Sequence, residues 1–219
     1  MSALIDQLPR LRFGVNDAAP LQYAAVPTLK LGIRIEERSQ RPIQSVLLDV
    51  QIQIAARRRS YGAGETDRLL ELFGTPDRWA TSLRTLPWTR TTLAVPPFTG
   101  STVADLLIPC TYDLEVTAAR YFAALEDGEV PLELLFSGSV FYTGDAGGLQ
   151  MGRIAWDSDV DYRLPVSVWR ATMDRHFPAS AWLRLGRESF DRLSAYKARH
   201  AFESWDAAVD ALIAKEQPN

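Results

Sequence analysis

Alternating apolar and polar positions dominate the first two-thirds of the chain. In residues 28–36 every second residue is apolar, at Leu29, Leu31, Ile33 and Ile35. Residues 45–55 repeat the pattern, and similar patterning predicts strands at 11–15, 89–95, 102–109, 113–122, 132–142 and 150–155. A period of two is typical of antiparallel strands with one buried face. Eight short strands separated by turn residues predict a β-sandwich.

Helical spacing replaces this alternation in two places. Residues 64–86 predict two short helices: the first buries Leu69, Leu70, Leu72 and Phe73 and ends at Gly74, and the second begins at Thr75-Pro76. After residue 161 the spacing predicts helices at 165–177, 187–200 and 204–215, the last capped by Ser204.

These elements predict an α+β fold, namely a mainly antiparallel β-sandwich with a short helical insertion and a C-terminal helical segment packed on it. No repeat or long linker divides the chain, so residues 1–219 are expected to form a single domain. Its β-sandwich body is expected at 1–161, with the insertion at 64–86, and the helical segment at 162–219. The apolar stripe of Val166, Trp169, Met173 and Phe177 gives this segment a face to bury.

The charge is unevenly distributed along a chain of ordinary globular composition, with 219 residues and a net charge of −3. Residues 1–60 carry +4 and residues 111–161 carry −8, so the two segments are expected to attract each other. The dense basic run Arg57–Arg59 predicts a solvated strand end or an anion site. A low isoelectric point argues against nucleic acid as the main partner. No signal peptide and no apolar run of about 20 residues is visible, so we expect a cytoplasmic protein without membrane insertion.

Cys110 is the one cysteine, which excludes an internal disulfide, an iron–sulfur cluster and a Cys-rich zinc site. It follows the apolar residues 107–109, so it is predicted to be buried and inert. As a nucleophile it would need His176 or His200 beside it in space.

Asp157, Asp159 and Asp161 form the densest acidic cluster. Their spacing begins an EF-hand loop, but Tyr162 and Val168 stand where that loop needs a glycine and a bidentate acid. The cluster is therefore a weak metal candidate. A solvated strand edge and an acidic docking patch are the alternatives.

The catalytic motifs GxSxG, HExxH and GxGxxG do not occur, and the chain has two histidines. The sequence therefore predicts no catalytic residue and no cofactor, and it favours a non-enzymatic protein. Six tryptophans remain, which either lock helices onto a sheet or meet a partner. The candidates for an interaction surface are Trp169, His176, Phe177 and Trp182.

Several phrases then suggest a family: LFG…RW at 72–79, VPPFTG at 95–100, PCTYD at 109–113, GEVPL and LFSG within 128–138, and YRLPVSVW at 162–169. They resemble an uncharacterised bacterial family associated with gene clusters of actinobacterial-type, high-affinity NiFe hydrogenases. The resemblance covers about residues 12–213 and implies an accessory role in the maturation, assembly or stability of a hydrogenase. One cysteine and two histidines make a poor nickel carrier, so the implied role acts through protein contacts, with a hydrogenase subunit or maturation factor as partner.

Two functions from different classes follow. The first is a non-enzymatic accessory or interaction protein. The alternative is a small-molecule-binding protein or hydrolytic enzyme with a pocket at the sandwich–helix junction, using Cys110 or the carboxylates of residues 157–161. A deep cleft with convergent polar groups favours the alternative, and a broad apolar patch favours the interaction protein.

Overall fold

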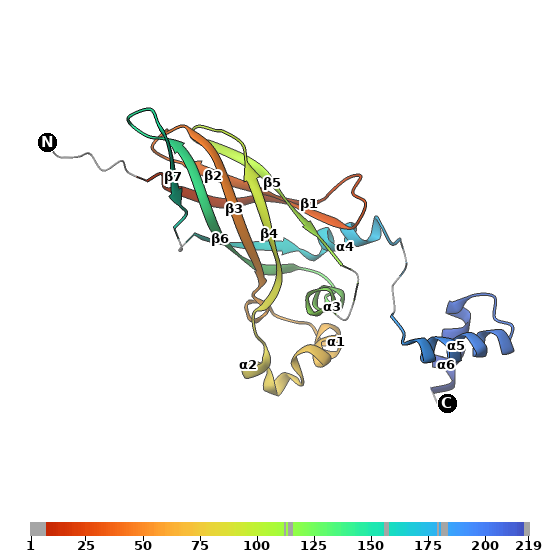
Figure 1. Cartoon of the computed structure of the whole chain (residues 1–219). Coiled ribbons are helices and arrows are strands. Elements are labelled where there is room, and N and C mark those ends of the chain that lie inside the picture. The colour runs from red at the N-terminus through yellow and green to blue at the C-terminus, as the bar shows by residue number, and fades with distance from the viewer. Residues whose placement is uncertain are drawn as a thin grey trace. The chain divides into compact units, whose positions relative to one another are not determined.

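The structure is a computed structural model that describes residues 8–111, 113, 116–155, 158–178, 180 and 184–216. Its contacts divide the chain into two compact units, residues 1–181 and residues 182–219. The first unit holds two antiparallel sheets in a sandwich-like arrangement, and both units contain helices (Figure 1). The predicted α+β sandwich is confirmed, and the organisation as a single domain stays a prediction.

The smaller sheet has the order β1-β2-β5, with β1 at Leu11–Pro20, β2 at Thr28–Glu37 and β5 at Ser101–Pro109. The larger sheet begins β4-β3-β6, with β4 at Leu86–Val95, β3 at Ile43–Ile54 and β6 at Glu129–Thr143. Two short strands share the far edge of β6, namely β7 at Leu149–Arg153 and β8 at Asp159–Pro165. Just outside these two strands, the backbone N–H of Ile154 donates to the carbonyl oxygen of Gly138 over 3.1 Å, and that of Phe136 donates to the carbonyl oxygen of Ser158 over 2.9 Å.

The core lies between the sheets and is built from the alternation seen in the sequence. The inward residues of β2 and β3 are essentially fully buried: Leu29, Leu31, Ile33 and Ile35, and Val46, Leu48, Val50, Ile52 and Ile54. Gly138 on β6 allows the close approach of the two central strands. Its φ is 139°, and a Cβ there would lie 2.0 Å from the carbonyl oxygen of Leu47 on β3, which no side chain tolerates.

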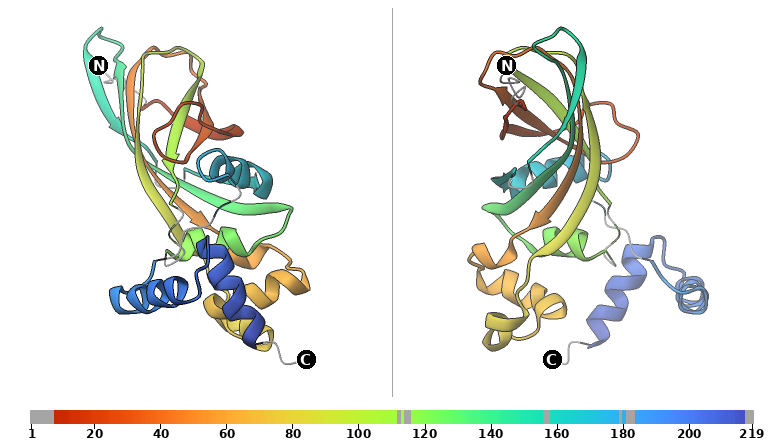
Figure 2. Two further views of the ribbon diagram at one scale, coloured as in Figure 1. Left: turned by 90° about the vertical axis from the view of Figure 1, so that its right-hand side faces the viewer. Right: turned by 60° about the vertical axis from the view of Figure 1, so that its left-hand side comes forward.

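Short helices gather at one end of the sandwich (Figures 1 and 2). They are η1 at Ala56–Arg58, α1 at Ala63–Phe73, η2 at Pro76–Arg78, α2 at Trp79–Ser82 and α3 at Thr117–Ala124. Helix α1 ends at Gly74, whose φ is 72°, as predicted. Its buried face is narrower than predicted, because Leu69 and Phe73 are enclosed while Leu70 is exposed and Leu72 is half-buried.

Helix α4, Val166–Asp174, packs against β1, β2 and β8 and belongs to the first unit. It buries Val166, Trp169 and Met173, as the apolar stripe predicted, and it ends before Phe177. Helices α5, Arg187–Arg199, and α6, Trp205–Glu216, form the second unit and pack against each other. The predicted cap of α6 is confirmed, because the backbone N–H of Ala207 donates to Ser204 Oγ over 3.0 Å.

Two elements differ from the sequence prediction. The strand predicted at 113–122 is wrong, since residues 117–124 form α3. Its sequence TAARYFAA is rich in alanine, which has the highest helix propensity. The predicted β body ended at 161, but β8 continues to Pro165. Its period-two residues Val160, Tyr162 and Leu164 stand between charged residues that suggested an ion site instead.

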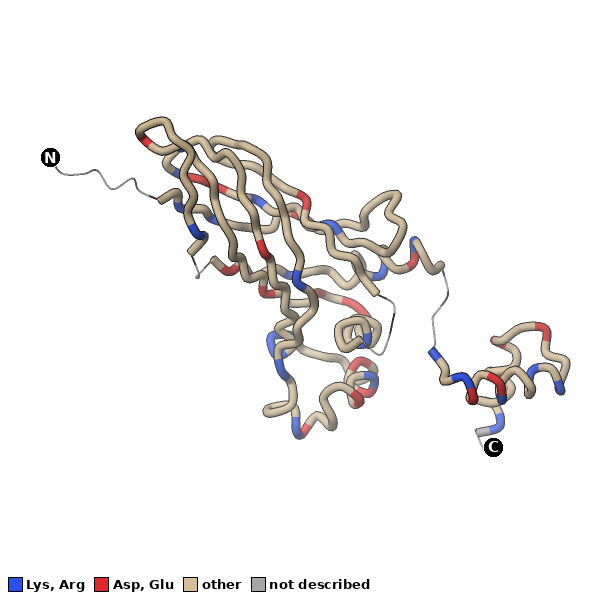
Figure 3. The backbone as a smooth tube through the Cα atoms, viewed as in Figure 1, with Lys and Arg blue, Asp and Glu red and all other residues tan. Residues whose placement is uncertain are grey.

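Charges are interspersed along the sandwich rather than gathered on one face (Figure 3). The basic N-terminal and acidic central segments do meet, for example where Arg41 lies 3.0 Å from Asp145. Among the described residues, no helix has the length and apolar character required to cross a bilayer.

Candidate functional site

Cys110 follows β5 and is buried, with 8% of its surface exposed. Its thiol donates to the carbonyl oxygen of Ile108 over 3.4 Å, and its backbone N–H donates to that of Pro27 over 2.7 Å. Burial raises the pKa of the thiol to about 12. At neutral pH the group is a protonated thiol and not a nucleophile, so the predicted burial is confirmed.

The junction between the sandwich and its helices holds a small pocket of about 60 Å³, lined by Cys110, Trp88, Phe122 and Trp169. The rings fill most of this junction. Trp169 stacks on Phe122 with ring centroids 5.3 Å apart, and Trp88 lies 4.9 Å from Phe122. Ligand pockets usually measure about 300–1,000 Å³, so this one is too small for a drug-sized substrate.

The predicted interaction residues do not form one exposed surface. Trp169 is 6% exposed and belongs to the core. His176 is half-buried and joins the end of α4 to the β1–β2 loop, because its Nε2 lies 3.0 Å from the carbonyl oxygen of Ala24. Phe177 is half-buried beside the imidazole. Trp182 lies outside the described residues.

Asp159 and Asp161 of the acidic cluster lie on a strand and not in a loop. Asp159 and Asp161 both point outward from β8, and Asp157 lies outside the described residues. Arg58 bridges two carboxylates, with its guanidinium 2.8 Å from Asp161 and 2.9 Å from Glu133. An arginine therefore offsets the like charges. Within the described ranges, no group of three or more His, Cys, Asp or Glu side chains is arranged to hold a metal ion.

A buried ion pair joins Arg59 to Glu65, with side chains 9% and 6% exposed. The guanidinium donates two parallel hydrogen bonds of 2.8 and 2.9 Å to the carboxylate, which also accepts from the backbone N–H groups of Gly62 and Glu126. Burial opposes ionisation of Glu65, but these hydrogen bonds outweigh it and hold the pKa of the carboxyl at about 2. The pair fastens the start of α1 to the segment that leads into β6.

Each arginine of the Arg57–Arg59 run donates hydrogen bonds to acceptors in the first unit. Arg57 Nε donates to the carbonyl oxygen of Leu83 over 3.2 Å, in addition to the pairs of Arg58 and Arg59. Arg57 and Arg58 are exposed just beyond the end of β3, as predicted for a solvated strand end, whereas the side chain of Arg59 is buried. No buried side-chain nitrogen or oxygen in the described part of the chain lacks a hydrogen-bond partner, as is usual for a structural core.

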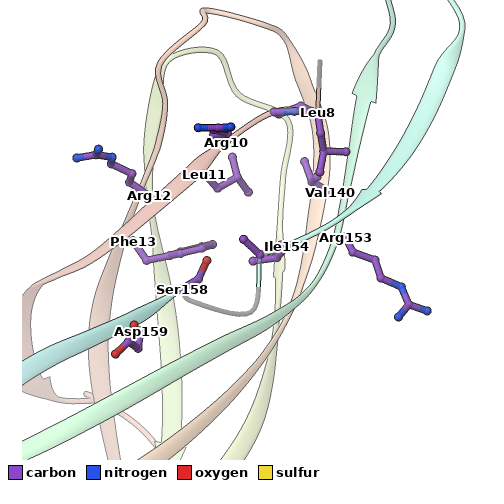
Figure 4. A pocket seen from close by; sticks show the side chains of 12 residues that line it. Leu8, Arg10, Leu11, Arg12, Phe13, Val140, Arg153, Ile154, Ser158 and Asp159 are labelled. Atoms are coloured by element: carbon purple, nitrogen blue, oxygen red, sulfur yellow. The ribbon is translucent and has the colours of Figure 1, made fainter. Parts of the chain in front are cut away.

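A cavity of about 770 Å³ lies at one edge of the sandwich, between β1 and the edge where β7 gives way to β8. Figure 4 shows Leu11, Phe13 and Ile154 pointing into it, while Arg12 and Arg153 extend away on opposite sides. Phe13 also stacks on the ring of Phe136, with centroids 4.5 Å apart. The lining thus combines apolar side chains with polar ones such as Ser158 and Asp159. This cavity is not the predicted pocket at the junction.

An exposed apolar group occupies the outer face of the larger sheet, at the β6–β7 hairpin. Met151 on β7 pairs with the half-buried Phe141 on β6, Leu149 follows on the same face, and Leu47 on β3 lies one diagonal step away. Met151, Leu149 and Leu47 are 59%, 69% and 51% exposed. We call these four residues the outer-face patch. Outward positions of a half-buried sheet are normally polar, as at Asp49.

Sequence reasoning overlooked the outer-face patch, although it left a signal. Leu47 is the one large apolar residue among the outward positions of 45–55, where Asp49, Gln51 and Gln53 follow it. Leu149 and Met151 alternate in the same way around Gln150. The register of β3, β6 and β7 was needed to bring the residues together.

The profile of a family of unknown function, DUF6084, matches residues 8–219. The chain belongs to this family. No curated protein matches the DUF6084 chain.

Three solved structures are distantly similar to the DUF6084 chain. A β-glucosidase from Kluyveromyces marxianus is 4% identical with a TM-score of 0.25, over 71% of this chain and 15% of that one. β-Glucosidase 3B from Thermotoga neapolitana, in complex with α-D-glucose, is 13% identical with a TM-score of 0.24, over 70% and 17%. The putative ApaA protein from Bordetella pertussis is 11% identical with a TM-score of 0.22, over 72% and 96%. The DUF6084 chain thus spans about a sixth of either glucosidase.

Proposed function

We propose that this DUF6084 protein is a non-enzymatic accessory protein that binds another protein through the outer-face patch. The observation that carries the proposal is the exposure of Leu47, Leu149 and Met151 around Phe141, on a sheet face where polar residues are the rule. Contiguous exposed apolar residues mark contact surfaces in soluble proteins. Methionine suits such a surface because its flexible thioether adapts to the partner.

The chemistry of the thiol and the junction supports an interaction protein over a hydrolytic enzyme. The Cys110 thiol is held protonated by burial, and the junction pocket of about 60 Å³ is filled by aromatic rings. The carboxylates Asp161 and Glu133 are engaged by Arg58. Cys110 and Asp161, two of the groups that the enzymatic alternative would use, are therefore engaged within the fold.

The partner we propose is a subunit or maturation factor of a NiFe hydrogenase, met in the cytoplasm. This step rests on the resemblance of the phrases at 72–79, 95–100, 109–113, 128–138 and 162–169 to a family associated with hydrogenase gene clusters. The role is the maturation, assembly or stabilisation of the hydrogenase.

Affinity capture from the native host, grown while oxidising hydrogen, tests the proposal. The tagged full chain is expected to capture a hydrogenase subunit or maturation factor, identified by mass spectrometry. The double variant Leu149→Glu, Met151→Glu is expected to lose that protein, because two carboxylates would enter an apolar contact unpaired.

Gln51→Glu is the matched control, since it adds a carboxylate to the same outer face away from the patch. It should capture the partner as well as the unaltered chain does. Capture of no hydrogenase-related protein would overturn the choice of partner. Equal capture by the double variant would overturn the role of the patch.

A further inference from the structure

The second unit has too small a core to account for its own fold. Its helices α5 and α6 with their connection, residues 187–216, are called the C-terminal hairpin (Figure 2). Helix α5 has no buried residue, and Ala208 is the buried hydrophobic residue of the hairpin among those described. Helices of 13 and 12 residues are marginal in water without tertiary packing.

Large apolar side chains remain exposed on the C-terminal hairpin. On α6 they are Trp205, Val209, Leu212 and Ile213, each 39–52% exposed. Their spacing of four, three and one residues places them on one side of the helix. Phe190 on α5 is 43% exposed and lies beside Trp205, with ring centroids 5.6 Å apart, so the apolar surface continues from one helix to the other.

The contacts within the hairpin fix its turn and the pairing of its two helices. Lys197 Nζ donates to the carbonyl oxygens of Phe202 and Glu203 over 2.7 and 3.3 Å, and it lies 5.7 Å from the ring of Trp205. Lys215 Nζ lies 3.3 Å from the hydroxyl of Tyr196. These contacts hold the two helices in one orientation and leave the apolar surface uncovered.

The two helices carry opposite charge. Helix α5 has four basic and two acidic residues, and α6 has three acidic and one basic. Arg192 and Arg199 on α5, and Asp206 and Asp210 on α6, form no ion pair with any residue that the structure describes. The one ion pair recorded on the hairpin, Arg187 with Asp191, lies within α5.

We propose that the occupant of this apolar surface is a second copy of the C-terminal hairpin, so that two chains join through a four-helix bundle. A two-fold axis makes an interface self-complementary. In such a pairing the basic α5 of each copy lies beside the acidic α6 of the other, while the apolar sides of all four helices meet in the centre. Opposite charges at the flanks of a bundle set the partner and its orientation. The inference goes beyond the proposed function and uses a different surface.

The mass of the full chain in solution, measured by analytical ultracentrifugation over a range of concentrations, is the first test. A dimer of about 49 kDa is expected, twice the 24.5 kDa of one chain. Leu212→Glu is expected to shift the protein to monomer. The matched control is Ala214→Glu, nine residues after Trp205 and so half a turn away from the stripe, which should leave the dimer intact.

A pair of charge-reversed chains makes the test specific. The first chain carries Arg192→Glu and Arg199→Glu, and the second carries Asp206→Arg and Asp210→Arg. Each alone would place like charges across the interface and is expected to be monomeric. Their mixture restores opposite charges between the chains, although each hairpin still has like charges on its own two helices, so a mixed dimer is expected.

A monomeric unaltered chain at the highest concentration, or charge-reversed chains that fail to combine, would overturn the proposal. Loss of dimer in Ala214→Glu as readily as in Leu212→Glu would also overturn it. Capture of a hydrogenase protein by the outer-face patch is a separate readout, so either proposal can fail without the other.

Discussion

Replacement of Trp169 by alanine should destabilise the sandwich severely. The indole is 6% exposed and stacks on Phe122 at an interplanar angle of 10°. A buried aromatic side chain removes about 150–250 Å² from water. At about 25 cal/mol per Å² this is worth about 4–6 kcal/mol before the contacts retained by alanine are subtracted.

The expected loss of unfolding free energy for Trp169→Ala is about 3–5 kcal/mol. The pocket of about 60 Å³ already beside the ring would merge with the vacated space, which enlarges the cavity and raises its cost. Since a domain has only about 5–15 kcal/mol of stability in total, the variant should unfold at a much lower urea concentration.

Urea unfolding followed by far-ultraviolet circular dichroism measures this loss, because the signal reports the sheets rather than a tryptophan. Tyr23→Ala is the matched control: Tyr23 is 99% exposed, and its removal should change stability by less than about 0.5 kcal/mol. A loss below about 1 kcal/mol for Trp169→Ala would refute the enclosed ring and return Trp169 to the candidates for a contact surface.

Three further predictions concern other parts of the first unit. Glu65→Gln should lower the free energy of unfolding by about 3–5 kcal/mol, because it leaves Arg59 buried without a counter-charge. In the unaltered chain the pKa of Glu65 is held at about 2, below its ordinary 4.5, so this stabilisation is complete above about pH 4.5 and is lost as the pH falls toward 2. The urea midpoint should therefore fall with pH in the unaltered chain, and it should depend less on pH in Glu65→Gln. Gly138→Ala should abolish the cooperative thermal transition or lower it sharply, whereas Gly148→Ala, where an added Cβ meets nothing within 4 Å, should not. The Cys110 thiol should resist Ellman's reagent at neutral pH and react fully in urea; rapid stoichiometric reaction in the native protein would contradict its burial.

The strands with a fully buried face could be predicted from the sequence. Leu29 to Ile35 and Val46 to Ile54 alternate without interruption, and the buried residues of β2 and β3 are those that the pattern predicts. Helix α3 was not predicted in this way, since Val116, Ala118 and Phe122 stand at even-numbered positions, as the residues of one strand face would. Intrinsic helix propensity outweighs that pattern in TAARYFAA.

The candidate site depended on pairings that no local pattern contains. Leu47 and Met151 become neighbours only through Phe141, on a strand that pairs with both of theirs. The three arginines at 57–59 looked equivalent in the sequence, but their acceptors come from different elements, such as Glu65 on α1 and Asp161 on β8. Trp169 was a surface candidate because tryptophan is frequent at interfaces, and its burial follows from the position of Phe122 on a helix that the sequence did not predict.

The order in which the central strands pair has a consequence for synthesis on the ribosome. Strand β3 lies between β4 and β6, and Val50 pairs with both Thr91 and Phe136. One edge of β3 therefore stays unpaired while the whole chain between β3 and β6 is made, and that edge is open to other chains. Pairings between distant segments also fold slowly, because a long loop must close before any contact is gained. Nascent chains that end before residue 143 should consequently be bound by holding chaperones, and chains released after β6 has emerged should escape them.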